Sequence, residues 1–297
     1  MPDRALRGLA CVAMCNSIRP SACSVVVATL MLCPDCFARV SVMAERGATQ
    51  HPLPTPCLPH CMARQSRLCA PGSPHLVQLV AAAGARPLAQ DDQRTRFLAW
   101  MSEALDACPT RLHAYSLLHD GVWLLLTPDE PRGLSGFVQT LARRTSRAQG
   151  AVAATPAPAR QAIWAGRFRS AVIEPAAWAL PAMVWVDDAA RRAGLVATGQ
   201  VWPWSSQSAH CGLGTGGGPA PALQLPAAYW ALGNTPFARE AAYGQLLLAG
   251  LHAQRVRELE QALRRGTALG DAHFLQQLTQ RSGRQLQPAP RGRPSKA

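Results

Sequence analysis

The chain has 297 residues, 48% of them hydrophobic and 16% charged, a composition that supports a packed core and excludes global disorder. No apolar run reaches the roughly 18 residues that a membrane-spanning helix needs, so we expect a cytoplasmic protein with no membrane partner. The net charge is +13, and nearly all of the positive charge is arginine because Lys296 is the only lysine. Such an excess of guanidinium groups favours nucleic acid as a partner, although an arginine-rich genome-wide composition would give the same charge.

The first 61 residues differ in composition from the rest, because they hold seven of the ten cysteines. Two close pairs of thiolates could surround one zinc ion. The pairs are Cys33 with Cys36 and Cys57 with Cys61. The segment between them has no helix or strand pattern, so we predict that residues 1–61 are a disordered or non-native extension, with the natural start at Met62.

Regular patterns begin after Pro74. The apolar run 75–84 predicts a strand, and the three- and four-residue spacing of apolar positions in 91–108 predicts an amphipathic helix. Residues 111–118 and 122–127 predict a hairpin. Its turn is placed at Asp120-Gly121, because glycine accepts the positive φ of a tight hairpin turn.

The next residues complete a β-α-β-β-α-β order. A second helix is predicted at 131–149, a loop at 151–160, a fourth strand at 168–174 and a further helix at about 175–192. This order predicts an α+β fold with a ferredoxin-like core and one extra helix.

The sequence after the predicted core indicates a linker followed by a helical region. Residues 206–225 are rich in glycine and proline, which predicts a linker, and 226–283 form a predicted C-terminal helical region. Its helices are predicted at 236–249, 252–265 and 271–281, and residues 284–297 are a basic tail.

Five blocks of the sequence, in order, resemble the single-tyrosine HUH transposases, particularly the REP-associated tyrosine transposases of bacteria. The blocks are LLLTPDEPRGLSGFVQTLARR, IWAGRFRSAVIE, RRAGLVATGQVWPWSSQSAHCGLG, YWALGNTPFAREAAY and HFLQQLTQRSGRQLQPAPRGRP. Together they span most of residues 62–297. The resemblance implies a transposase-like HUH-fold domain over 62–205 and a DNA partner, single-stranded or hairpin, with no small-molecule substrate.

The resemblance also implies a chemistry. In the family, a His-hydrophobic-His pair on a strand binds Mg²⁺ or Mn²⁺, and a helix tyrosine attacks the scissile phosphate to form a 5′-phosphotyrosine link. Two imidazoles at positions i and i+2 of a strand point the same way and can share one ion. The ion stabilises the phosphate and the tyrosine is the covalent nucleophile.

This chain departs from the family at all three positions. The pair aligns with Gly121 and Trp123, and the tyrosine aligns with Trp185. None of these can bind a metal or attack phosphorus, so we predict no catalytic residues, no metal site and no cofactor. The three tyrosines of the chain, Tyr115, Tyr229 and Tyr243, lie outside the predicted nucleophile helix.

The DNA-binding features are better preserved. Arginines after the second helix and around the fourth strand could follow a phosphate backbone, and an Arg-Gly-Arg segment in the tail resembles a minor-groove hook. The predicted DNA-binding residues are Arg143, Arg144, Arg147, Arg167, Arg169, Arg291 and Arg293. A solvated basic face is the alternative for the first five.

Other hypotheses stay open at this point. A relocated metal-dependent nuclease could use His119 or His113 with an acidic residue, and a decaying homologue could have lost DNA affinity altogether. The adjacent acids Asp187 and Asp188 are expected to be solvated on their helix. The two tryptophans at the catalytic positions either fill the cleft or stack on a base.

Overall fold

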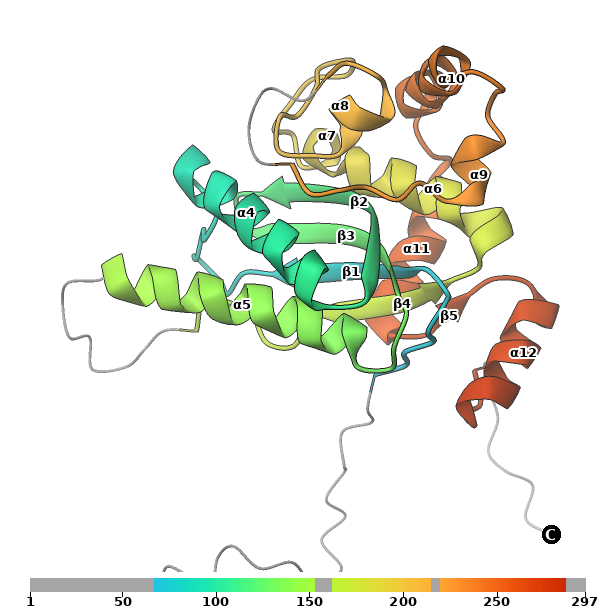
Figure 1. The fold of residues 1–297 in the computed structure, drawn as a ribbon, viewed down its shortest axis with the longest axis horizontal. Coiled ribbons are helices and arrows are strands. Elements are labelled where there is room, and N and C mark those ends of the chain that lie inside the picture. The colour runs from blue at the N-terminus through green and yellow to red at the C-terminus, as the bar shows by residue number, and fades with distance from the viewer. Residues whose placement is uncertain (1–66, 153–161, 215–219, 287–297) are drawn as a thin grey trace, which may run out of the picture. The chain divides into compact units, whose positions relative to one another are not determined.

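The fold is taken from a computed structural model that describes residues 67–152, 162–214 and 220–286. A five-stranded mixed sheet lies between two layers of helices (Figure 1). Its strand order is β2-β3-β1-β4-β5. The strands are β1 (His75–Val80), β2 (Thr110–Leu118), β3 (Gly121–Pro128), β4 (Arg169–Ile173) and β5 (Ala268–Leu269). The central strand β1 pairs antiparallel with both β3 and β4, whereas β4 and β5 are parallel.

Two helices cover one face of the sheet, the face turned toward the viewer in Figure 1. They are α4 (Asp91–Ala107) and α5 (Gly133–Val152). Phe97 and Met101 of α4 and Phe137 of α5 pack against alternate strand residues such as Val77 and Leu124. Alternation in a strand sends every second side chain to this face, so Val77 belongs to this core and its neighbour Leu76 to the other.

The opposite face is covered by helices from later in the chain. The longer ones are α6 (Pro175–Asp187), α10 (Pro236–Ala249) and α11 (Ala253–Arg265), and the short ones are α7 (Ala189–Arg192), α8 (Gln207–His210) and α9 (Ala227–Trp230). Met183 of α6 and Leu259 of α11 pack with Leu76 and Leu125 of the sheet. The last helix, α12 (Ala272–Ser282), uses Leu278 to pack against Leu68 and Val172.

Helices and strands lie close to the predicted ranges, with two corrections. The helix predicted at 175–192 is broken at Asp188, which ends α6 and precedes α7; Arg191 holds its carboxylate with two hydrogen bonds of 2.5 and 2.6 Å. The hairpin turn comes one residue earlier than predicted, at His119-Asp120, because Leu118 pairs with Gly121 inside the sheet.

Gly121 is therefore required for a different reason from the one expected. Its φ is not positive. A Cβ at this position would lie 2.8 Å from the backbone oxygen of Leu79 and 2.9 Å from the ring of Trp123. Close approach of the neighbouring strand and of the indole, rather than turn geometry, excludes a side chain here.

The chain after α7 continues along the outer edge of β2. The amide of Leu117 donates to the oxygen of Trp204, and the amide of Ser206 donates to the oxygen of Tyr115. The indole Nε1 of Trp202 donates to Leu117 over 2.8 Å. Helix α8 lies in the segment that composition predicted to be a linker, and the domain boundaries at residues 205 and 226 stay predictions.

Candidate functional site

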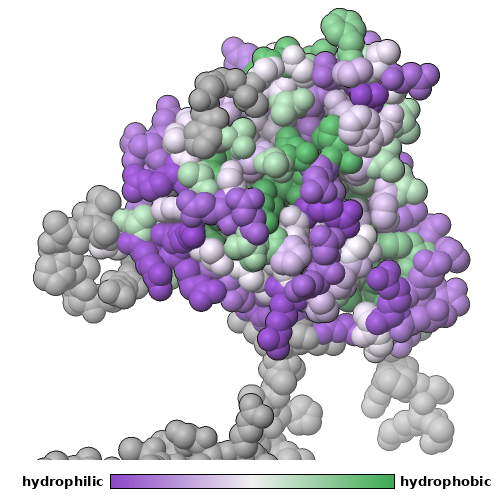
Figure 2. All heavy atoms as spheres, viewed as in Figure 1, coloured by the Kyte–Doolittle hydropathy of each residue, from purple (hydrophilic) through white to green (hydrophobic). Residues whose placement is uncertain are grey.

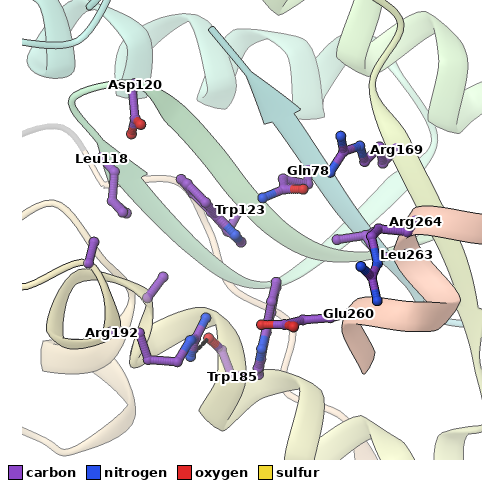
Figure 3. Close-up of a pocket in the computed structure, with 12 residues that line it drawn as sticks. Gln78, Leu118, Asp120, Trp123, Arg169, Trp185, Arg192, Glu260, Leu263 and Arg264 are labelled. Atoms are coloured by element: carbon purple, nitrogen blue, oxygen red, sulfur yellow. Dashed lines mark hydrogen bonds between the residues drawn. The ribbon is translucent and has the colours of Figure 1, made fainter. Parts of the chain in front are cut away.

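A cleft of about 400 Å³ opens between the sheet and the helices α6, α7 and α11 (Figure 3). Strand residues form one wall and helical residues form the other. The polar and aromatic side chains that line it are Gln78, Asp120, Trp123, Arg169, Trp185, Arg192, Glu260 and Arg264. The cleft contains two of the three positions that align with the family's catalytic residues.

The strand wall is a row of side chains across three neighbouring strands. Gln78 of β1 is paired with Trp123 of β3 on one side and with Arg169 of β4 on the other. Directly paired residues of antiparallel strands share a face, so the three side chains lie next to one another. The register of the sheet thus places an aromatic ring, an amide and a guanidinium in one line.

The helical wall is built around Trp185. Its side chain is 3% exposed, and the guanidinium of Arg192 lies 4.4 Å from the ring centre. Arg192 also donates to the backbone oxygen of Trp185 over 2.5 Å. The indole Nε1 of Trp185 is buried and has no hydrogen-bond partner among the described residues. A buried donor left without an acceptor costs about 1–3 kcal/mol.

The charges of the cleft favour a ligand that is anionic in part. Burial lowers the pKa of Arg192 to about 10, which leaves it cationic at neutral pH, and its Nη1 lies 3.6 Å from the Asp188 carboxylate. Arg169 and Arg264 are exposed and make no hydrogen bond or ion pair within the described ranges. Asp120 and Glu260 supply negative charge on the same walls.

Where the resemblance implies a pair of metal ligands, the structure has the indole of Trp123 and the bare backbone of Gly121. The benzo ring of Trp123 lies over Gly121, at 2.9 Å from where a Cβ would be. No imidazole or hydroxyl is among the side chains that line the cleft. In the part of the chain that the structure describes, no group of three or more His, Cys, Asp or Glu residues could hold a metal ion.

The other side of α6 carries a closed polar cluster, and here the expectation of solvated acids was wrong. Asp187 is 2% exposed and accepts hydrogen bonds from Ser206 Oγ at 2.5 Å, His210 Nδ1 at 2.6 Å and Tyr243 OH at 2.7 Å. The Nε2 of His210 faces the oxygen of His113 at 2.9 Å. Both ring nitrogens of His210 thus lie within hydrogen-bond distance of an oxygen atom.

The members of this cluster are held too tightly to serve as a relocated active site. Tyr243 is fully buried, and burial together with the Asp187 carboxylate raises its pKa well above the usual value, so its nucleophilic anion is disfavoured. No spacing in the sequence indicated the cluster, because its members come from α6, the segment before α8, α8 itself and α10. Adjacent Asp188 is also buried, against Arg191 and Arg192.

The two histidines considered for a replacement metal site are engaged by protein groups. His113 uses Nδ1 on the oxygen of Gln224 and Nε2 on the Thr127 hydroxyl at 2.7 Å. His119 Nδ1 lies 2.6 Å from Nη2 of Arg94.

The predicted DNA-binding arginines are not gathered at one place. Arg143, Arg144 and Arg147 lie on α5, on the other face of the sheet from the cleft, where the surface is largely hydrophilic (Figure 2). Arg144 forms an ion pair with Glu103. Arg167 is exposed and lies near Arg67, whose pKa is lowered to about 10 by burial and by that charge.

Of the predicted set, Arg169 alone lines the cleft among the described residues, while Arg291 and Arg293 lie outside them. Arg192 and Arg264 were missed, because they stand on separate helices and no motif links them. None of the described helices is long and apolar enough to cross a membrane.

No family model matches the sequence, and no curated protein matches it. One solved structure, described as a REP-associated tyrosine transposase bound to a REP hairpin, is similar with a TM-score of 0.42 and 17% sequence identity. The similarity covers 56% of this chain and 96% of that chain. The cleft itself combines the indole of Trp123 with the guanidinium groups of Arg169 and Arg264, which have no ion pair among the described residues, and no hydroxyl or imidazole lines it.

Proposed function

We propose that this protein is a transposase-like DNA-binding protein that binds single-stranded or hairpin DNA and does not cleave it. The observation that carries the proposal is the cleft. Arg169 and Arg264 line it and have no side-chain partner among the described residues, and Trp123 and Trp185 stand where the resemblance implies a metal ligand and a nucleophile. The ordered sequence blocks that resemble REP-associated tyrosine transposases support the DNA partner. The strand order β2-β3-β1-β4 supports a ferredoxin-like core.

The absence of cleavage follows from the requirements of the reaction. Attack on a phosphodiester needs a hydroxyl in line with the phosphorus and positive charge on the non-bridging oxygens. Arginines can supply the charge, but an indole at position 185 has no oxygen to attack with. We therefore propose that no Mg²⁺ or Mn²⁺ is needed, that the protein acts through binding alone, and that it does so in the cytoplasm.

The proposal is tested with labelled single-stranded hairpins, incubated with the full chain in Mg²⁺ or Mn²⁺ and separated on a denaturing gel. We expect binding under native conditions and no protein-linked DNA band. A metal-dependent covalent band would refute the inactive assignment, and its loss in a Tyr115→Phe, Tyr229→Phe or Tyr243→Phe variant would identify the nucleophile. Failure to bind any hairpin would refute the DNA partner.

The salt dependence of binding shows which arginines contact phosphate. Arg169→Gln and Arg264→Gln should each reduce the slope of log affinity against log salt by about 0.7, the value for one lost contact to a single strand. Arg132→Gln is the matched control, because it removes an exposed arginine that precedes α5 and does not line the cleft. Equal effects of all three substitutions would mean that the charge acts as a diffuse field and that the cleft is not the binding site.

A further inference from the structure

We propose that the cleft holds one unpaired nucleotide of the bound DNA, with the base stacked on Trp123 and a phosphate held by Arg169 and Arg264. The inference rests on the proposed function and deepens it, because it names the part of the DNA that the site recognises. In this proposal Trp123, at the position where the resemblance implies a metal ligand, contacts the DNA and does not only fill space in the cleft.

Trp123 offers a stacking surface at a fixed position. It is half-buried, borders the cleft, and its benzo ring lies over Gly121, where the missing side chain leaves room for the indole. Pairing with Gln78 in the sheet fixes the position of its backbone. A base that stacks on an aromatic side chain gains about 1–3 kcal/mol, whichever base it is.

The unpaired arginines suit a phosphate next to that base. Arg169 stands two strands away from Trp123 in the same row, and Arg264 projects into the cleft from α11 on the facing wall (Figure 3). Neither has an ion pair or hydrogen bond to give up within the described part of the chain. A guanidinium fork binds two phosphate oxygens at once.

The remaining groups favour a nucleotide over a simple anion. Asp120 and Glu260 line the same cleft and would repel a bare phosphate, but their carboxylates can accept hydrogen bonds from the N–H groups of a base. A cavity of about 400 Å³ lies in the range of about 300–1,000 Å³ that is usual for small-ligand pockets.

The test compares two labelled DNA hairpins, one with an unpaired mixed-sequence tail and one blunt, by fluorescence anisotropy with the full chain. Trp123→Leu should weaken binding to the tailed hairpin about tenfold and leave binding to the blunt hairpin within twofold. Trp123→Phe, which keeps a ring, should retain most of the affinity. Trp230→Leu is the matched control, because Trp230 is 53% exposed on α9 and does not line the cleft.

A tail of abasic nucleotides keeps the phosphates and lacks the bases, so it measures the contribution of the base to the affinity. The wild-type protein should lose about tenfold in affinity for this tail, and Trp123→Leu should lose nothing further.

If Trp123→Leu and the abasic tail are both without effect while the wild-type protein binds hairpins, the nucleotide site is overturned and the proposed function stands. If no hairpin binds but a free deoxynucleoside monophosphate quenches the fluorescence of the wild type and not of Trp123→Leu, the nucleotide site stands and the DNA function falls. Binding of neither probe overturns both.

Discussion

Helix α6 has two sides that use the same kinds of side chain in opposite ways. On one side, Trp185 lines a cleft together with Arg169 and Arg264, whose guanidinium groups have no ion pair or hydrogen bond in the described parts of the chain. On the other, two residues further along, Asp187 accepts hydrogen bonds from a serine, a histidine and a tyrosine in a site closed to solvent. The closed side has the composition of a catalytic centre, and the open side does not.

The difference teaches that residue types alone do not identify a site. A hydroxyl, an imidazole and a carboxylate that satisfy one another in a closed core are stabilising contacts, because no substrate can reach them. Groups that lack hydrogen-bond partners at an open recess are the ones to which a ligand can supply a partner.

If the closed cluster around Asp187 stabilises the fold, removal of the Asp187 carboxylate must lower the stability of the protein. Asp187→Ala leaves the hydroxyls of Ser206 and Tyr243 and the His210 ring without their buried acceptor, so we expect a loss of about 3–5 kcal/mol in the free energy of unfolding. Urea unfolding followed by circular dichroism measures it. Asp129→Ala is the control: both members of its ion pair with Arg111 are exposed, and we expect a loss of at most about 1 kcal/mol. Similar losses in the two variants would contradict a special role for the closed cluster.

On the open side, a side chain at Gly121 should be costly. A Cβ there meets the Leu79 oxygen at 2.8 Å, so Gly121→Ala should lose about 1–3 kcal/mol of stability. Because that oxygen belongs to the backbone, most of the loss should persist in a Trp123→Ala background. Gly150→Ala, where nothing lies within 4 Å, should instead gain about 0.5–1 kcal/mol. Full rescue by Trp123→Ala would show that the indole alone obstructs position 121, and an imidazole could then be restored there.

The smallest expected effect compares two buried indoles. Trp164 donates its Nε1 to the Ala142 oxygen at 3.2 Å, whereas Nε1 of Trp185 has no partner in the parts of the chain that the structure describes. Trp164→Phe should therefore destabilise the protein more than Trp185→Phe, by about 1 kcal/mol, because only the former breaks a hydrogen bond. Differential thermal unfolding of the two variants measures the gap. A larger loss for Trp185→Phe would mean that its indole is needed for packing and not available to a ligand.

Much of the fold could be predicted from local pattern. The three- and four-residue spacing that predicted the helix at 91–108 is the spacing by which Phe97 and Met101 reach the core. The turn was misplaced by one residue. Glycine is needed at position 121 because of close contacts with Leu79 and Trp123, and these contacts cannot be inferred from the neighbouring sequence.

The candidate site was only partly predictable. The resemblance identified Gly121, Trp123 and Trp185, and proximity to the fourth strand suggested Arg169. Glu260 and Arg264 come from a helix far along the chain, and only the packing of α11 against β4 and β1 brings them to the cleft. The burial of Asp187 was missed for the same reason, since its partners follow it by 19, 23 and 56 residues.

The segment that runs beside β2 has a consequence for how copies of the chain can meet. Its hydrogen bonds to Leu117 and Tyr115 occupy backbone groups that an outermost strand would otherwise offer to another polypeptide. At the opposite margin, β5 is only two residues long, and so provides little template for a foreign strand. Sheet-to-sheet aggregation is thereby disfavoured at both margins. Among the described residues, Phe237 and Leu248 of α10 are large exposed apolar side chains and offer a helical surface for self-association instead.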